Sequence, residues 1–321
     1  MRKRGRVVLL MGPTGAGKTG VALELGAGLP LEIVSVDSAM VYRGFDIGSA
    51  KPTAAERARI PHHLIDIRAA SETYSAGHFV RDAITAIEGI LQRGRTPLLV
   101  GGTMLYFHAL VHGLAEMPEG DAEVRADIDA QAARDGWAAL HAELTRVDPA
   151  AGARIHPNDP QRIQRALEVF RLTGSPISEL QSLRQPALGD YDTLQIVLAP
   201  STRALLHARI EQRFREMMAA GFLEEVRQLH SRSERQGELP AFRAVGYRQL
   251  AGHLEGAYSL DEGVRRGIVA TRRLARRQLT WLRTLPDAHW ILSDDLAVAL
   301  REVRRRVSEM PSISGGGRGV C

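Results

Sequence analysis

Residues 7–19 read Val7-Val8-Leu9-Leu10-Met11-Gly12-Pro13-Thr14-Gly15-Ala16-Gly17-Lys18-Thr19, and this stretch decides the fold. Its apolar start predicts a buried strand, and the apolar residues of 21–25 predict a helix directly after the glycines. The segment between them matches the P-loop pattern G-x-x-x-x-G-K-[ST] in full, in the strand–loop–helix setting that the motif requires. The predicted phosphate-binding residues are Gly12, Pro13, Thr14, Gly15, Ala16, Gly17, Lys18 and Thr19.

The chemistry of this motif explains its residue types. Glycines let successive N–H groups turn toward an anion, and the positive end of the following helix dipole faces the same point. Lys18 adds a compact positive charge, and the Thr19 hydroxyl is placed to ligate a Mg²⁺ that bridges phosphate oxygens. The motif predicts a bound di- or triphosphate, with ATP as its ordinary ligand, and leaves the reaction open.

The composition is that of a globular protein with a basic charge balance. The chain has 321 residues, 44% hydrophobic and 25% charged, with a formal net charge of +5. No apolar run is long enough for a membrane span, and the N-terminal apolar run is too short for a signal peptide, so we expect a cytoplasmic protein. The single cysteine, Cys321, excludes a disulfide or a cysteine zinc site within one chain.

Arginine carries almost all of the positive charge, since Lys3, Lys18 and Lys51 are the only lysines. Arginines crowd residues 154–171 and 265–283, both of helical character. These helix faces are either simply solvated or form a surface that meets a polyanion such as RNA, and charge alone does not decide between the two.

The remaining pattern predicts an α/β fold, a parallel sheet of the P-loop NTPase type flanked by helices. Further strands are predicted at 31–36, 61–67, 96–100 and 191–198, with a helix at 76–92 capped by Ser75. Helices at 121–134, 137–147 and 159–172 form a helical insertion. The predicted organisation is a catalytic core of 1–117 and 189–310 that ends in basic helices, an insertion at 118–188 and a flexible tail at 311–321.

Two strand ends bear on the predicted ligand crevice. Asp37 follows the strand 31–36, where a carboxylate either points into the crevice or caps the next turn. The strand 96–100 ends in Gly101-Gly102-Thr103 without an acid, which counts against an ATPase and predicts close approach of a ligand to the glycines. The turn-rich segment 42–52 is predicted to face substrate.

Other polar groups allow two interpretations each. His62 and His63 are adjacent in a short strand and point to opposite faces, which argues against a metal site. Arg209 and Arg213 lie four residues apart on one helix face, either as a clamp on a pyrophosphate or as a solvated face. The segment 243–248 is a glycine-centred loop whose arginines and tyrosine are typical of an RNA contact.

Several segments together resemble the bacterial tRNA dimethylallyltransferases, over residues 6 to about 290. They are GPTGAGKT, SVDSAMVYRGFDIGSAKP, PHHLIDI, YSAGHF, LLVGGTMLYFHAL, HPNDPQRIQRALEVF, RIEQRF, RAVGYRQL and ATRRLARRQLTWLR. The P-loop is shared with a large superfamily, whereas its combination with Asp37-Ser38, Gly101-Gly102-Thr103 and 243–248 is specific. One departure is Met40, where many members carry glutamine.

The resemblance implies transfer of a dimethylallyl group from dimethylallyl diphosphate to N6 of the adenosine 3′-adjacent to the anticodon, in tRNAs that read codons beginning with U. The P-loop would then hold a diphosphate leaving group. Asp37 would be the general base, and Thr19 with Mg²⁺, Lys18 and Arg213 would stabilise the leaving group. Asp37, Thr19 and Arg213 are therefore the expected catalytic residues.

The resemblance also implies that the anticodon stem-loop of tRNA is the partner, bound by a monomer. The implied tRNA contacts are Asp37, Ser38, Ala39, Met40, Thr103, Arg125, Gln161, Arg162, Ile163, Gln164, Arg165, Arg243, Ala244, Val245, Gly246, Tyr247 and Arg248. Two alternatives remain: a P-loop small-molecule or nucleotide kinase, and a non-catalytic RNA-binding protein whose P-loop acts as a switch.

Overall fold

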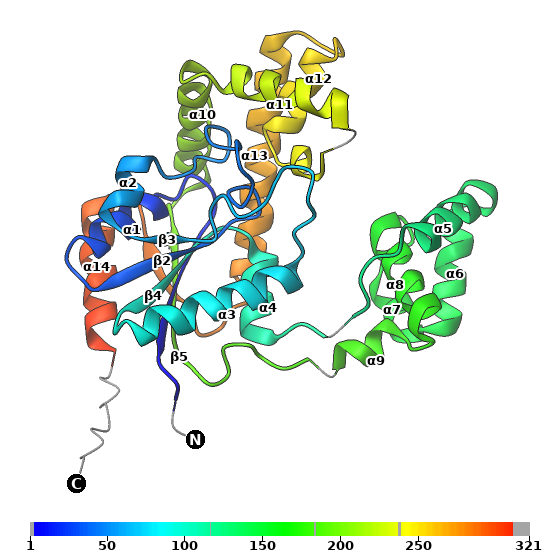
Figure 1. Ribbon diagram of the computed structural model, residues 1–321, viewed down its shortest axis with the longest axis horizontal. Helices are drawn as coiled ribbons and strands as arrows, with labels where there is room; N and C mark the ends of the chain where they lie inside the picture. The colour runs from blue at the N-terminus through cyan, green and yellow to red at the C-terminus, as the bar shows by residue number, and fades with distance from the viewer. Residues whose placement is uncertain (1–2, 116, 183, 237–238, 311–321) are drawn as a thin grey trace. The chain divides into compact units, whose positions relative to one another are not determined.

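The computed structural model describes residues 3–310, apart from residues 116, 183, 237 and 238 (Figure 1). The predicted tail at 311–321 therefore lies outside the described residues. The chain forms two compact units, one from the described parts of 1–108 and 190–321 and the other from 109–189. The insertion predicted at 118–188 falls within the second unit.

The first unit is built on a parallel six-stranded sheet, which confirms the predicted fold class. The strand order is β3-β2-β4-β1-β5-β6, and every neighbouring pair is parallel. Because all strands run in one direction, the segments that follow β1, β2 and β4 meet at the same edge of the sheet. The strands are β1 (Arg6–Met11), β2 (Leu31–Val36), β3 (His62–His63), β4 (Thr96–Gly101), β5 (Asp192–Ala199) and β6 (His289–Leu292).

The helix predicted at 76–92 is α3, and its predicted N-cap is confirmed, since the Ser75 hydroxyl accepts the His78 N–H at 3.1 Å. The helices are α1 (Lys18–Gly26), α2 (Ala54–Arg59), α3 (Ala76–Gln92), α4 (Met104–His112), α5 (Ala122–Asp135), α6 (Trp137–Val147), α7 (Pro149–Arg154), α8 (Pro160–Thr173), α9 (Ile177–Ser182), α10 (Arg203–Ala219), α11 (Phe222–Gln236), α12 (Tyr247–Leu254), α13 (Leu260–Leu282) and α14 (Leu296–Glu309).

Helices cover both faces of the sheet. On one face, α1 and α14 lie side by side (Figure 1). Val8 and Leu10 of β1 pack with Leu25 of α1 and Val303 of α14 in a continuous apolar core. On the opposite face α3 lies against β2 and β4. The central strands are buried on both sides, and this explains why residues 7–11 of β1 form an uninterrupted apolar run rather than an alternating pattern. β2 is equally buried, although it includes Glu32 and Ser35.

The predicted strand at 61–67 is wrong in length, because only His62 and His63 pair with β2. Leu64 and Asp66 adopt positive φ angles of 62° and 58°, so the backbone leaves the extended region directly after β3. His63 Nε2 lies 2.7 Å from Glu32 Oε2, an intramolecular partner that accounts for this histidine without a metal.

A second apolar core, rich in aromatic rings, includes part of the segment 42–52. Phe45 is fully buried, and its ring centroid lies 4.5 Å from that of Tyr247 on α12. Val41 belongs to the same core, together with Phe222 of α11 and Ile268 of α13. The apolar side chains of this segment therefore pack against α11, α12 and α13, whereas its residues 48, 49 and 52 line a cavity, so its contact with substrate stays a prediction.

Charged groups fix the same segment in place. The buried ammonium of Lys51 lies 2.6 Å from a carboxylate oxygen of Asp46 and 2.6 Å from one of Asp66. The Glu225 carboxylate on α11 accepts three consecutive N–H groups, from Asp46 at 3.1 Å, Ile47 at 2.6 Å and Gly48 at 3.1 Å. The polar groups of the segment are thus largely directed at the protein itself.

The second unit has its own small core. Ile128 of α5, Leu140 and Leu144 of α6, and Ile163 and Leu167 of α8 are all fully buried together. The three helices predicted from the sequence in this region match α5, α6 and α8 to within two residues.

A buried carboxylate on β2 leads to a prediction about stability. Glu32 is 3% exposed and accepts two hydrogen bonds from Arg93, at 2.9 and 2.7 Å, besides its contact with His63. The hydrogen bonds from Arg93 outweigh burial and hold the pKa of Glu32 at about 2. Because the folded pKa lies below the unfolded one, this stabilisation is present above about pH 5 and is lost as the pH falls toward 2.

We therefore expect Glu32→Gln to lower the free energy of unfolding by on the order of 2 kcal/mol at pH 7, with a much smaller difference at pH 3. Urea denaturation at the two pH values measures this. Glu24→Gln is the matched control, because Glu24 is 55% exposed in its ion pair with Arg59 and should change stability little. Equal losses for Glu32→Gln at pH 7 and pH 3 would contradict the prediction.

Candidate active site

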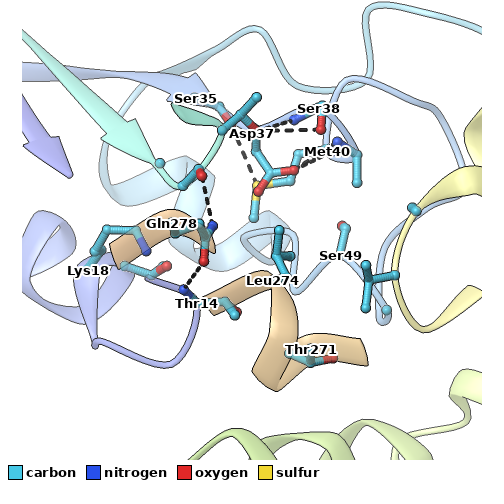
Figure 2. Close-up of a pocket in the computed structure, with 18 of the residues that line it drawn as sticks. Thr14, Lys18, Ser35, Asp37, Ser38, Met40, Ser49, Thr271, Leu274 and Gln278 are labelled. Carbon is cyan, nitrogen blue, oxygen red and sulfur yellow. Dashed lines mark hydrogen bonds between the residues drawn. The ribbon is translucent and has the colours of Figure 1, made fainter. Parts of the chain in front are cut away.

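The candidate site is a cavity of about 490 Å³ at the carboxyl ends of β1, β2 and β4 (Figure 2). The P-loop lines one side of it, and the segments after β2 and β4 line another. Helices α10 and α13 complete the wall with Arg213, Leu274 and Gln278. All of these elements belong to the first unit.

The P-loop takes the conformation that its residues predict. Gly17 has φ 85° and stands at the N-cap of α1, where it offers no side chain to the free N–H groups of the helix. Gly12 is required for a different reason, because a Cβ there would lie 2.3 Å from the Leu198 carbonyl oxygen at the end of β5. The Lys18 ammonium donates to the carbonyls of Gly12 and Pro13, both at 2.8 Å. The Thr19 hydroxyl is exposed at the start of the helix.

Positive charge is concentrated at this loop. Burial is the main reason that the pKa of Lys18 falls to about 7; the nearby Arg213 lowers it further, and Asp37 opposes the fall. Arg213 has no hydrogen-bond or ion-pair partner among the residues that the structure describes. Arg209 donates to the Asp294 carbonyl at 2.8 Å, and with Arg213, Lys18 and Thr19 it lines a second pocket at the P-loop, so the two-arginine clamp stays a prediction. A bound anion would stabilise both Lys18 and Arg213 in their charged forms.

Asp37 both closes the turn after β2 and lines the cavity, the two roles that its position in the sequence left open. Its Oδ1 accepts the N–H groups of Ala39 at 2.8 Å and Met40 at 3.3 Å, which closes a turn directly after β2. Its Oδ2 has no hydrogen-bond partner within the described part of the chain, and Asp37 lines the cavity. One oxygen therefore orients the carboxylate, and the other is available to accept a proton.

The ends of β2 and β4 are joined beside Asp37. The Thr103 hydroxyl accepts the Ser38 N–H at 3.0 Å, and the Thr103 N–H donates to the Val36 carbonyl at 3.2 Å. Ser38, Ala39, Met40 and Thr103 all line the cavity, as the predicted base-binding residues should. Met40 also accepts a weak hydrogen bond from Ser35 Oγ, at 3.6 Å from its sulfur.

The segment 243–248 is only partly the loop that the sequence predicts. Arg243 ends a 3₁₀ turn (Pro240–Arg243), and Tyr247 and Arg248 begin α12. Tyr247 is fully buried, and its hydroxyl donates to Glu225 at 2.7 Å. A ring without accessible surface cannot stack on an RNA base, so the predicted stacking role of Tyr247 is wrong.

The other members of this segment remain accessible or serve the backbone. Arg243 and Arg248 are exposed, and Ala244 and Val245 are half-buried and line the cavity. Gly246 has φ 93°, and a Cβ on it would lie 3.1 Å from the Phe222 ring, so packing demands this glycine.

Within the second unit, the predicted RNA-contacting residues divide by their environment. Gln161 and Arg162 are exposed on α8, and Gln164 donates to Asp129 at 2.7 Å. Ile163 is fully buried in the helical core, so its side chain has no surface to offer RNA. The burial pattern of α8 separates these neighbouring residues because they point to different sides of one helix.

Two arginines of this unit share one buried carboxylate. Glu168 is fully buried; it accepts Arg125 Nε at 2.8 Å and Arg165 Nη1 at 2.7 Å, and the Asp121 N–H at 2.8 Å. The bonds from Arg125 and Arg165 keep the pKa of Glu168 below its usual range in spite of burial. Both guanidinium groups are thus anchored at one end, with 47% and 32% of the side chain exposed.

The glycines after β4 line the cavity, and they are also crowded by the protein itself. A Cβ on Gly101 would lie 2.0 Å from the Val36 carbonyl oxygen, and one on Gly102 would lie 2.4 Å from the Gln278 amide nitrogen. Close approach of a ligand to these glycines stays a prediction, and their close contacts with Val36 and Gln278 are a second reason for glycine here. Gln278 was missed by sequence reasoning, because a single amide on a basic helix gives no signal until the helix is placed against the sheet.

No group of three or more His, Cys, Asp or Glu residues that could hold a metal was found among the described residues. A search of the described helices finds none long and apolar enough to cross a membrane.

Comparisons with known proteins agree on one family. Residues 40–285 match the model of the family described as IPP transferase. A tRNA dimethylallyltransferase from Methylococcus capsulatus is 56% identical over 94% of this chain and 97% of its own length. Among solved structures, a tRNA isopentenylpyrophosphate transferase from Bacillus halodurans is 36% identical with a TM-score of 0.69, over 94% of this chain and 95% of that one. A eukaryotic dimethylallyltransferase acting on tRNA is 27% identical with a TM-score of 0.80, over 94% and 77%.

Proposed function

This chain belongs to the IPP transferase family, and we propose that it transfers a dimethylallyl group from dimethylallyl diphosphate to N6 of an adenosine in tRNA. The observation that carries the proposal is the cavity in which Lys18 and Arg213 face Asp37. Paired cations suit a diphosphate, and a carboxylate with one unpartnered oxygen suits a proton acceptor. The acceptor proposed is the adenosine 3′-adjacent to the anticodon in tRNAs that read codons beginning with U.

The bond changes can be assigned to these residues. The adenine nitrogen forms a bond to the allylic carbon as the carbon–oxygen bond to diphosphate breaks and its electron pair leaves with the diphosphate. An exocyclic amine is too weak an acid to lose its proton first, so Asp37 accepts the N6 proton as positive charge develops on nitrogen. Lys18, Arg213 and the N-terminal N–H groups of α1 stabilise the departing diphosphate.

Mg²⁺ fits this arrangement as a partner of the diphosphate. Thr19 offers an exposed hydroxyl at the start of α1, and oxygen is the ligand that Mg²⁺ prefers. Because no cluster of three acidic, histidine or cysteine side chains is found in the described part of the chain, diphosphate oxygens and water would supply most of the ligands. A bound Mg²⁺ would neutralise part of the negative charge that develops on the leaving group.

A phosphotransferase is not favoured by the same geometry. In many ATP-using P-loop proteins an acid at the end of a neighbouring strand helps to hold Mg²⁺. Here that position is Gly101-Gly102; the Val36 backbone leaves no room for a side chain at Gly101, and the Gln278 side chain occupies the space beside Gly102. The family assignment agrees with this, so the kinase alternative is set aside.

For the RNA substrate we propose that a monomer acting in the cytoplasm binds the anticodon stem-loop. The target base enters the cavity beside Asp37, Ser38 and Thr103, since a base must leave its stack to react at an exocyclic atom. Exposed arginines, including Arg162 and Arg243, contact phosphates.

The first test is transfer itself, with Asp37→Asn as the diagnostic variant. Asparagine keeps an oxygen that can accept the two N–H groups of the turn but cannot take up a proton. We expect the single-turnover rate to fall by at least about 100-fold, with the affinities for tRNA and donor within about twofold of wild type. Labelled dimethylallyl diphosphate, tRNA and mass analysis of the nucleosides measure the product.

Asp287→Asn is the matched control, because Asp287 is exposed and lies outside the cavity lining. Label that enters RNA only when ATP is added would contradict the proposed reaction. Parallel loss of tRNA binding in Asp37→Asn would contradict the general-base role.

The second test concerns the arginines of the second unit. Arg162 is 69% exposed with only a long contact to Asp159, 3.4 Å from its Nε, so its charge is free for a phosphate. We expect Arg162→Ala to flatten the dependence of log tRNA affinity on log salt by about one unit. Filter binding at several salt concentrations measures the slope.

Arg301→Ala is the control for overall charge, since Arg301 is exposed on α14. Its slope should equal that of wild type. If Arg162→Ala kept the wild-type slope, Arg162 would not contact a phosphate and would belong to a solvated helix face.

A further inference from the structure

Gln278 makes two hydrogen bonds that link distant parts of the site (Figure 2). It lies on α13 and is 6% exposed. Its side-chain oxygen accepts the Thr14 N–H of the P-loop at 3.0 Å, and its side-chain nitrogen donates to the Gly102 carbonyl after β4 at 2.7 Å. One amide therefore joins three segments that are far apart in the sequence.

The amide packs closely against Gly102. A Cβ on Gly102 would stand 2.4 Å from the amide nitrogen of Gln278 and 3.5 Å from the Gly12 carbonyl oxygen. The absence of a side chain at Gly102 thus leaves the space that the glutamine occupies. Removal of the amide would take away the partners of the Thr14 N–H and the Gly102 carbonyl, which are part-buried at the cavity.

The neutrality of the amide matters at this place. Lys18 of the P-loop and Arg213 of α10 line the same cavity as Gln278. A carboxylate would compete with a diphosphate for those cations, and an ammonium could not accept the Thr14 N–H. An amide offers a donor and an acceptor without charge, so it holds the loop and leaves the positive potential for the ligand.

The two bonds also connect the two halves of the proposed reaction. Thr14 belongs to the loop that would hold the leaving group, and Gly102 precedes Thr103, which binds the Ser38 N–H beside Asp37. We propose that Gln278 is a positioning residue, which fixes the P-loop against the end of β4 and so sets the diphosphate site relative to the base-binding side of the cavity. Only the position of the diphosphate site relative to the base-binding side rests on the proposed function. The hold of Gln278 on the P-loop concerns diphosphate binding alone.

Two substitutions test this. Gln278→Met keeps the length of the side chain and removes both hydrogen bonds; we expect it to weaken binding of inorganic diphosphate with Mg²⁺ and to raise the KM for dimethylallyl diphosphate, each about tenfold. Its tRNA affinity should change less than twofold. Isothermal titration calorimetry with inorganic diphosphate and steady-state kinetics give the two readouts.

Gln278→Glu provides a readout that loss of packing would not produce. A protonated glutamic acid can donate to Gly102 and accept from Thr14 as the amide does, whereas the carboxylate cannot donate and repels the ligand. We expect diphosphate affinity at least tenfold weaker at pH 8 and a smaller loss at pH 5.5, each relative to wild type at the same pH, because burial raises the pKa of such a carboxyl against the opposing effect of Lys18 and Arg213. Gln228→Glu is the matched control, since Gln228 is exposed on α11.

The outcomes separate the two proposals. Wild-type diphosphate affinity in Gln278→Met, in a variant with an unchanged melting temperature, would overturn the positioning role. So would a Gln278→Glu variant whose weakening is the same at both pH values. If wild type binds diphosphate but transfers no prenyl group to tRNA, the proposed function fails, and the diphosphate titrations still decide the role of Gln278.

Discussion

The site depends on positive charge that the protein holds in a confined place without fully neutralising it. Burial and the neighbouring Arg213 bring the pKa of Lys18 to about 7, and Asp37 is the acidic group that opposes this shift. The parallel sheet makes the arrangement possible, because it brings the ends of β1, β2 and β4 to one edge. An anion bound there would relieve the repulsion between the two cations, so binding of the ligand itself stabilises the charged forms of Lys18 and Arg213.

Local signals in the sequence predicted the parts of the site that are contiguous in the chain. The P-loop carries its strand, glycines and helix within twenty residues, and Asp37 directly follows an apolar strand. The position of Gln278 could not be predicted in this way, because its partners Thr14 and Gly102 lie 264 and 176 residues away. The same reason explains why the contacts of Gly101 and Gly102 within the protein were not predicted, since the groups that crowd them come from other segments.

The burial of individual side chains was the second property that the sequence did not predict. Tyr247 and Ile163 have polar or basic neighbours in the sequence, yet both are completely buried. Residues within four positions of one another on a helix can face either the core or the solvent. Charge patterns have the same ambiguity. Arg125 and Arg165 are anchored by the buried Glu168, whereas Arg162, on the same helix as Arg165, is largely exposed, and no local pattern separates them.

The Glu225 carboxylate orders residues 46–48 when the chain folds. It accepts three consecutive N–H groups from residues 46–48 and the hydroxyl of Tyr247, as an inorganic anion held in a backbone nest would. The conformational entropy of this segment is therefore lost once, when the chain folds, and need not be lost again in each turnover. A helix side chain thus acts as a permanent internal ligand, and the segment between Asp37 and α2 is already ordered when substrate arrives.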